Sequence, residues 1–157
     1  MRIGITGTPG TGKTTVAETL EREVISVKEF AKEKELGKEI DGIFEVDVDA
    51  VEQKLPEDCW IEGHLAHKVG VDYCIVLRTS PDILEERLEK RDYSKEKVSE
   101  NVEAEKMDLI LSEAFEKCKI YEVDTTGKSV EEVVAEIREA VKNKESKYAV
   151  CDWSSFF

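Results

Sequence analysis

The chain has 157 residues, which is enough for one domain around a single hydrophobic core. Its 36 acidic residues outnumber its 23 basic ones, and a formal net charge of -13 argues against tight direct binding to nucleic acid, although it would suit a basic protein partner. No apolar run approaches the roughly 20 residues of a membrane-spanning helix.

Short apolar runs alternate with segments of helical periodicity along the chain. We interpret as strands the runs at residues 3–5, 24–27, 59–61, 73–77 and 120–123. The expected helices cover about residues 13–22, 28–36, 49–55, 81–91, 95–118 and 129–144. This alternation predicts an α/β domain with a parallel sheet, because each parallel strand needs a crossover connection to the next.

The first apolar run leads into a phosphate-binding loop. Residues 7–14 read GTPGTGKT, a complete GxxxxGK[ST] motif between an expected strand and an expected helix. Glycines let backbone N–H groups turn inward around phosphates, and the following helix adds the N–H groups of its N-terminus. Lys13 would reach the β- and γ-phosphates, and the Thr14 hydroxyl would ligate Mg²⁺. The residues expected to bind the nucleotide are Gly10, Thr11, Gly12, Lys13, Thr14 and Thr15.

An acidic residue ends the third apolar run. The carboxyl ends of parallel strands share one edge of the sheet, so Glu62 should face the phosphate-binding loop and could hold Mg²⁺ through water. The alternative is a solvated acid at a strand end. His64 could orient or deprotonate an attacking water or a substrate oxygen, or it could be a loop histidine bonded to the backbone. For His67 a structural role is favoured, and a zinc pair is not expected, because no third ligand cluster accompanies the histidines.

Two arginines lie one helical turn apart before a break in the fourth expected helix. Arg87 and Arg91 share a face, and the segment at residues 92–94 then interrupts the helix. They could close over phosphates and neutralise the charge that develops during phosphoryl transfer, or they could pair with surface acids. Arg78, at the end of the fourth strand, is expected to have a structural role.

The fifth expected helix carries a stripe of apolar residues on one face. We interpret this stripe as core, in a single helix over residues 95–118. Its members are Val98, Val102, Met107, Ile110, Leu111, Ala114 and Phe115. After the last helix, the aromatic segment at residues 148–157 could be a contact site for a partner or a tail that folds back onto the domain.

The four cysteines are widely spaced and form no CxxC pair. This spacing favours free thiols over a disulfide framework or a zinc site. Since the chain also leads directly into a strand, without a signal-peptide pattern, we expect a cytoplasmic protein.

Together these features resemble the P-loop nucleoside monophosphate kinases. The closer resemblance is to the adenylate kinase isoenzyme 6 family, whose members also act in maturation of the small ribosomal subunit. The segments that carry it are GTPGTGKTT at 7–15, Glu62 with His64, VLRT at 76–79, LxxRLxxRxY at 84–93, Asn101 with Glu105, and DWS at 152–154.

The resemblance implies one domain over residues 1–157, a P-loop NTPase fold with a five-stranded parallel sheet in the order 2-3-1-4-5 and helices on both faces. A monophosphate-binding segment would cover about residues 28–50, and a short lid about residues 91–101. The implied reaction transfers the γ-phosphoryl group of MgATP to AMP or a related monophosphate, with slow ATPase activity. Arg91 would touch phosphate from the lid, and a basic small-subunit ribosomal protein would be a partner.

Two departures from the family pattern affect these expectations. Glu62 stands where aspartate is common, so its reach to Mg²⁺ through water is longer. No arginine lies between Arg22 and Arg78, and Lys32 stands where the family tends to have arginine. Lysine only partly imitates the arginine fork that grips a monophosphate, so we expect weak, broad acceptor binding. Lys32 and Arg87 are the candidate residues for binding the acceptor.

Two alternatives to this kinase stay open. One is an ATP-driven ribosome assembly factor whose kinase activity is incidental. The other is a kinase for another small molecule on the same fold.

Overall fold

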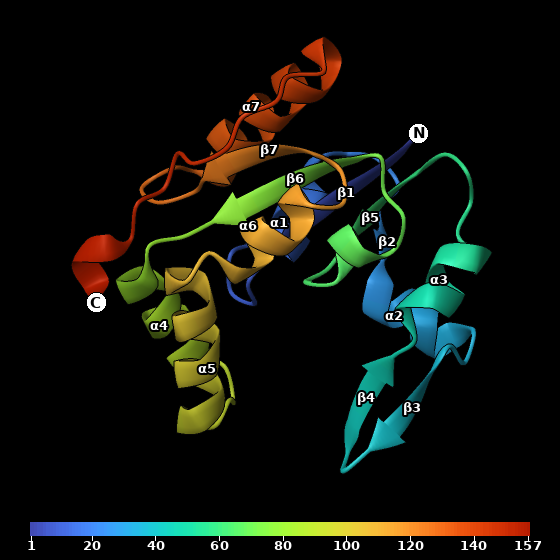
Figure 1. The fold of residues 1–157 in the computed structure, drawn as a ribbon, viewed down its shortest axis with the longest axis horizontal. Coiled ribbons are helices and arrows are strands. Elements are labelled where there is room, and N and C mark those ends of the chain that lie inside the picture. Colours follow the sequence, from blue (N-terminus) through green and yellow to red (C-terminus); the bar gives the residue numbers. More distant parts are fainter.

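A computed structural model describes all 157 residues and centres on a parallel sheet (Figure 1). Its five strands are β1 (Arg2–Gly7), β2 (Ile25–Ser26), β5 (Cys59–Glu62), β6 (Tyr73–Arg78) and β7 (Lys119–Asp124). They lie in the order β2-β5-β1-β6-β7 and every neighbouring pair is parallel. Counted within this sheet, the order is 2-3-1-4-5, so the expected fold class is confirmed.

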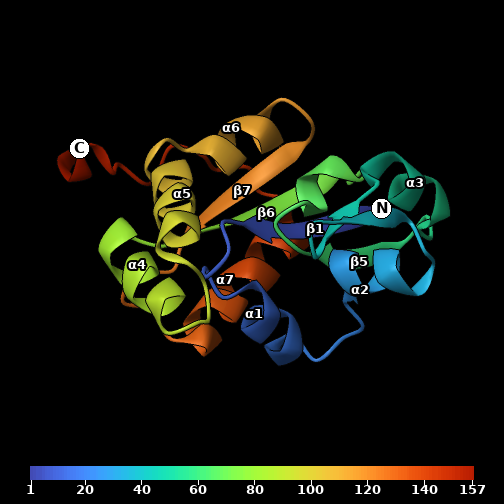
Figure 2. The same ribbon diagram turned by 90° about the horizontal axis from the view of Figure 1, so that it is seen from below.

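Seven α-helices surround the sheet, with short 3-10 turns at Ala66–Lys68 and Ser154–Phe156. The helices are α1 (Lys13–Thr19), α2 (Val27–Glu33), α3 (Val48–Lys54), α4 (Pro81–Glu89), α5 (Lys95–Lys106), α6 (Leu109–Phe115) and α7 (Val130–Asn143). Figure 2 shows α1 and α7 on one face of the sheet and α6 on the other. None of these helices combines the length and the apolar character needed to cross a lipid bilayer.

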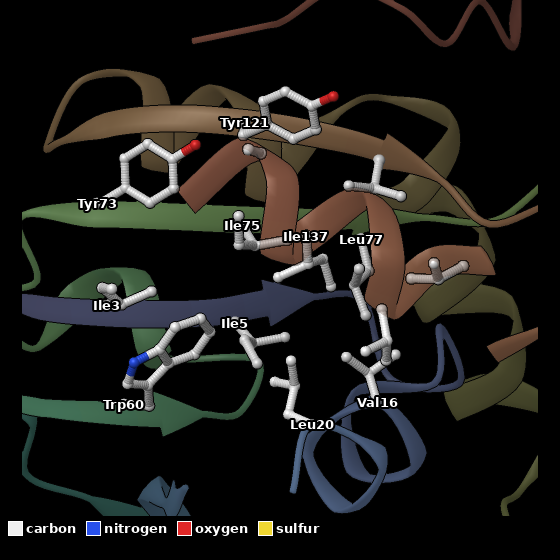
Figure 3. Packing of buried hydrophobic residues seen from close by; sticks show 14 residues of the cluster. Ile3, Ile5, Val16, Leu20, Trp60, Tyr73, Ile75, Leu77, Tyr121 and Ile137 are labelled. Atoms are coloured by element: carbon white, nitrogen blue, oxygen red, sulfur yellow. The ribbon is translucent and has the colours of Figure 1, made fainter. Parts of the chain in front are cut away.

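Two apolar cores lie on the two faces of the sheet. Alternate residues of β6 divide between them: Ile75 and Leu77 pack toward α1 and α7, whereas Val76 packs toward α2, α3 and α6. Figure 3 shows Ile137 of α7 packed against Ile75 and Leu77. Each fully buried aliphatic side chain contributes about 1.5–3 kcal/mol relative to exposure. Burial of both faces explains why these strands read as continuous apolar runs instead of alternating ones.

Serine side chains fix the starts of three helices. Ser94 accepts a hydrogen bond from Lys97 N at the start of α5, and Ser129 accepts one from Glu132 N at the start of α7. Ser26 caps α2 in the same way. These bonds satisfy N–H groups that have no partner inside the helix, so they set where each helix begins.

The expectation of a single helix over residues 95–118 is wrong. Asp108 adopts a left-handed conformation with φ of 56°, and its carboxylate bonds to Arg78, so the chain breaks into α5 and α6. The break divides the expected apolar stripe. Val98 and Ala114 are buried, as expected, but Met107 is 65% exposed and Phe115 is 54% exposed.

An antiparallel hairpin within residues 28–50 was not expected. It joins β3 (Gly37–Ile40) to β4 (Ile43–Val46) through a two-residue loop, Asp41-Gly42. Both loop residues have positive φ, 52° and 79°, which is the geometry of the turn that matches strand twist in tight hairpins. In Figure 1 this hairpin and the α4–α5 pair project from the same side of the sheet.

Candidate nucleotide-binding site

The phosphate-binding loop lies between β1 and α1 and depends on two glycines. Gly10 and Gly12 have φ of 97° and 96°, in the left-handed region that favours glycine. Gly10 also packs closely on α4, since an added Cβ would lie 2.8 Å from Leu84 Cδ1. The loop is braced from within, because the Thr11 hydroxyl donates to the Thr8 carbonyl at 2.8 Å. Its backbone conformation is therefore fixed by packing and by internal hydrogen bonds.

Lys13 curls back into the loop. Its ammonium donates to the Gly7 carbonyl at 2.8 Å and to the Thr8 carbonyl at 3.1 Å. Burial lowers the pKa of Lys13 to about 8; Glu62 opposes this shift and Arg91 adds to it. A lysine with this pKa carries its charge at neutral pH, so it can move from the two carbonyls to phosphate oxygens.

Glu62 lies at the carboxyl end of β5, level with Ile5 of β1. Burial raises the pKa of its carboxyl group, and the nearby Lys13 opposes the shift. His64 lies at the same edge of the sheet and is exposed. Partial burial of the ring lowers its pKa, and the charge of Lys13 lowers it further. Because water reaches the ring, solvent screening limits the size of this shift. The imidazole is therefore neutral at pH 7. The structure brings Lys13, Glu62 and His64 together, as expected.

His67 is buried between β1 and α6. Its Nδ1 lies 2.7 Å from Thr6 Oγ1, and its Nε2 lies 3.2 Å from Glu113 Oε1. The ring has two partners and is 1% exposed, so it ties α6 to the strand that precedes the phosphate-binding loop. This is the structural role favoured for His67.

A cavity of about 370 Å³ lies beside the phosphate-binding loop. This volume falls within the range of small-molecule sites. Thr125 and Lys128, from the loop after β7, also contribute to the lining of this cavity. The lining residues are Gly10, Thr11, Gly12, Thr15, Val16, Arg87, Lys90, Arg91, Thr125, Lys128, Val130 and Val133.

The two arginines expected at phosphates both line this cavity. Arg87 also donates to the Gly10 carbonyl at 3.2 Å, so it supports the phosphate-binding loop. Lys32 lies elsewhere: it is exposed on α2, with its ammonium 5.9 Å from the centre of the Phe44 ring in β4. Of the two residues expected at the acceptor, Arg87 lines the cavity beside the phosphate-binding loop and Lys32 does not.

The residues present fit Mg²⁺ held mainly by phosphate and water. Thr14 presents an exposed hydroxyl at the start of α1, and Glu62 offers one carboxylate at the neighbouring strand end. No group of three or more histidine, cysteine or acidic side chains lies close enough together to hold a metal ion by itself. Mg²⁺ keeps several waters and substrate oxygens in such sites, so this sparse donor set suits it.

A buried ionic network around Arg78 lies beneath the site. The sequence analysis predicted a structural role for Arg78 but not the acids that surround it. The Arg78 guanidinium contacts Glu105 Oε2 at 3.0 Å and Glu122 Oε2 at 2.8 Å, and it also bonds to Asp108. The structural role expected for Arg78 is present. The sequence did contain one signal for this network. Glu122 is an acid inside the apolar run of β7, and a buried acid requires a charged or hydrogen-bonding partner.

Comparisons with known proteins agree with this geometry. A family model described as an AAA domain matches residues 3–108. A protein from Pyrococcus abyssi is 45% identical over 100% of this chain and 93% of its own length. One from Methanocaldococcus jannaschii is 42% identical over 98% of this chain and 93% of its own length. Both are named "Putative adenylate kinase".

Solved structures show the same fold at low sequence identity. Deoxyadenosine kinase from M. mycoides with bound dATP aligns with a TM-score of 0.55 and 15% identity, over 90% of this chain and 100% of that chain. Shikimate kinase from Bacteroides thetaiotaomicron aligns with a TM-score of 0.54 and 13% identity, over 90% of this chain and 98% of that chain. With its phosphate-binding loop, its sheet order and its full-length relatives, the chain belongs to this AAA-domain family of P-loop kinases.

Proposed function

We propose that this protein is an adenylate kinase that transfers the γ-phosphoryl group of ATP to AMP. The observation that carries the proposal is the cavity beside the phosphate-binding loop, which is lined by Arg87 of α4 and by Arg91 just after this helix. The names of the full-length relatives from Pyrococcus and Methanocaldococcus support this choice of substrates.

The donor site supplies most of what phosphoryl transfer needs, which is positioning and charge stabilisation. Backbone N–H groups of the phosphate-binding loop would hold the β-phosphate, and the Lys13 ammonium would leave its two carbonyls for the β- and γ-phosphates. Arg91 would neutralise charge on the transferring group. Thr14 and, through water, Glu62 would hold Mg²⁺, which would supply positive charge to offset the charge of the phosphates.

The acceptor site would be formed by α2 and the β3–β4 hairpin, the monophosphate-binding segment of residues 28–50. This segment carries no arginine, and Lys32 is its candidate for the acceptor phosphate. An ammonium binds phosphate as a point charge without the geometry of a guanidinium fork, so we expect weak binding and broad selectivity for the monophosphate.

A second candidate function is ATP hydrolysis coupled to small ribosomal subunit maturation. The observation that favours it is His64, a neutral and exposed imidazole beside Glu62, which could orient a water toward the γ-phosphate. The net charge of -13 would attract a basic small-subunit ribosomal protein.

Nucleotide turnover separates the two functions. ADP formation is measured with MgATP alone and with AMP, CMP, GMP or UMP, each with and without a basic small-subunit ribosomal protein. Rapid ADP formation that needs AMP, with little hydrolysis of ATP alone, supports the kinase. Slow transfer, with hydrolysis that changes when the protein partner is added, contradicts the kinase as the main activity and supports the second candidate.

A further inference from the structure

A buried carboxylate outside the nucleotide cavity is bonded directly to the phosphate-binding loop. Glu105 lies in the last turn of α5 and is 3% exposed. Its Oε1 accepts a hydrogen bond from the Thr8 hydroxyl at 3.0 Å. Thr8 is the second residue of the loop and is 1% exposed, so this bond is shielded from water.

The Thr8 carbonyl, together with that of Gly7, also holds the Lys13 ammonium. The Thr8 carbonyl accepts from Lys13 Nζ at 3.1 Å and from the Thr11 hydroxyl at 2.8 Å. A shift of Thr8 would therefore move the resting place of the Lys13 ammonium and change the internal brace of the loop. The contact with Glu105 fixes the part of the loop on which phosphate binding depends.

The other oxygen of Glu105 is held by the end of β6. Oε2 accepts from Arg78 Nε at 3.0 Å and from the Thr79 amide at 3.1 Å. Arg78 is held in turn by Glu122, which is 0% exposed. The carboxylate thus has a fixed position that the rigid sheet determines, and hydrogen bonds to a charged group are stronger than neutral ones.

We infer that Glu105 is a positioning residue for ATP binding, which acts through the Thr8 hydroxyl to hold the phosphate-binding loop in its phosphate-accepting conformation. This inference rests on the proposed function for the identity of the nucleotide. Glu105 touches neither nucleotide nor metal; its effect passes through Thr8. Because none of the hydrogen bonds of the Glu105 carboxylate reaches α2 or the β3–β4 hairpin, the effect is selective for the ATP side of the reaction.

The test compares variants that remove or keep the hydroxyl of Thr8. Thr8→Val keeps the shape of the side chain and removes the donor, so MgATP binding weakens roughly tenfold, as expected for a lost hydrogen bond to a buried charge. Thr8→Ser restores the donor and recovers most of the affinity. The dissociation constant of MgATP is measured by titration calorimetry, and the KM values of ATP and AMP by steady-state kinetics. The KM of AMP stays within about twofold of wild type.

Glu105→Gln provides an independent route to the same contact. It weakens MgATP binding, and adding Thr8→Val to it weakens binding less than the two separate effects predict, because both changes remove one interaction. Asp108→Asn is the matched control, since Asp108 also bonds to Arg78 but does not touch the loop. Asparagine tolerates the left-handed conformation of residue 108 and leaves MgATP binding unchanged.

Two results would overturn the inference: Thr8→Val binds MgATP as tightly as wild type, or Asp108→Asn weakens binding as much as Glu105→Gln. If Glu105→Gln does not fold, the Thr8→Val and Thr8→Ser pair decides the question alone. Failure of the wild-type protein to phosphorylate AMP contradicts the proposed function only, because calorimetry still measures the coupling between Glu105 and ATP binding.

Discussion

At the scale of single residues, the chemistry of this site depends on where one ammonium group lies. Lys13 is held by two main-chain carbonyls inside the phosphate-binding loop, and no other side chain lies within that loop's motif to replace its charge. We expect Lys13→Ala to lower kcat/KM for ATP by at least about a hundredfold, the usual effect of removing a charge-stabilising donor. The measurement is ADP formation with AMP present, and circular dichroism checks the fold. Retained activity in a folded variant would mean that the loop is not the site.

The same ammonium predicts a pH dependence of ATP binding. Burial lowers the pKa of Lys13 to about 8 in the free protein, and bound phosphates favour the charged form. The affinity is therefore constant below pH 8 and is lost as the pH rises through that value. The KM of ATP should increase about tenfold between pH 7 and pH 9 while the KM of AMP changes little. A flat profile over this range would contradict a titrating Lys13.

His64 allows hydrolysis to be separated from transfer. A neutral imidazole at the strand edge can orient water, but AMP supplies its own nucleophilic oxygen. We expect His64→Ala to lower ATP hydrolysis without AMP by about a hundredfold, as for loss of a general base, and to lower transfer to AMP much less. Both rates come from the same ADP assay, with and without AMP. Equal losses would count against a water-handling role.

At the scale of elements, the boundary between α5 and α6 is set by one backbone conformation. Asp108 has φ of 56°, which costs a residue with a Cβ roughly 1 kcal/mol relative to glycine. Asp108→Ala and Asp108→Gly both lose the bond to Arg78, so the difference between them isolates the backbone. We expect Asp108→Gly to be more stable by about 1 kcal/mol in urea unfolding. Equal stabilities would mean that the left-handed conformation is not maintained in solution.

The elements also show which parts of the fold were predictable from the sequence. Strands buried on both faces give unbroken apolar runs, so a parallel sheet could be predicted from them, whereas the strand order was implied by the resemblance to the P-loop kinases. The β3–β4 hairpin was missed because its strands are largely exposed; Ile43, for example, is 65% exposed, and only Asp41-Gly42 marks the turn. The break at Asp108 was missed because Arg78, thirty positions earlier, imposes it.

The same distinction applies to the candidate site. The phosphate-binding loop is contiguous, so its residues could be named from the motif. Glu62 and His64 could be placed because parallel strands end at one edge of the sheet. Glu105 could not be given a role, because its contact with Thr8 joins residues 97 positions apart and depends on packing that no local pattern records.

At the scale of the whole molecule, the C-terminal segment closes the far edge of the sheet. Lys147 pairs with β7 through the Glu122 amide at 2.8 Å, and the Val150 amide donates to the buried Glu122 carboxylate at 2.7 Å. Trp153 lies over the Arg78 guanidinium and is 9% exposed. Of the two alternatives for residues 148–157, the structure therefore shows a tail folded back onto the domain at Val150 and Trp153, although Tyr148, Phe156 and Phe157 are exposed.

This arrangement predicts that the tail contributes to stability. Deleting residues 148–157 exposes the Arg78–Glu122 pair and removes the packing of Trp153, so we expect a loss of about 3 kcal/mol or more in urea unfolding. Deleting only Phe157 is the control, because this residue is 74% exposed; that change should stay within about 0.5 kcal/mol. Unchanged stability in the longer deletion, with loss of binding to a protein partner, would instead favour a contact site.

The bond between Thr8 and Glu105 has a consequence for the order in which the protein becomes functional during synthesis. The nucleotide motif is complete once the first 14 residues exist, but its anchor, Glu105, lies 97 positions after Thr8. At translation speeds of roughly 5–20 residues per second, a nascent chain carries the whole motif for several seconds before the anchor is made. Shortened chains that end before residue 105 therefore contain the entire motif and lack the contact that holds it in shape.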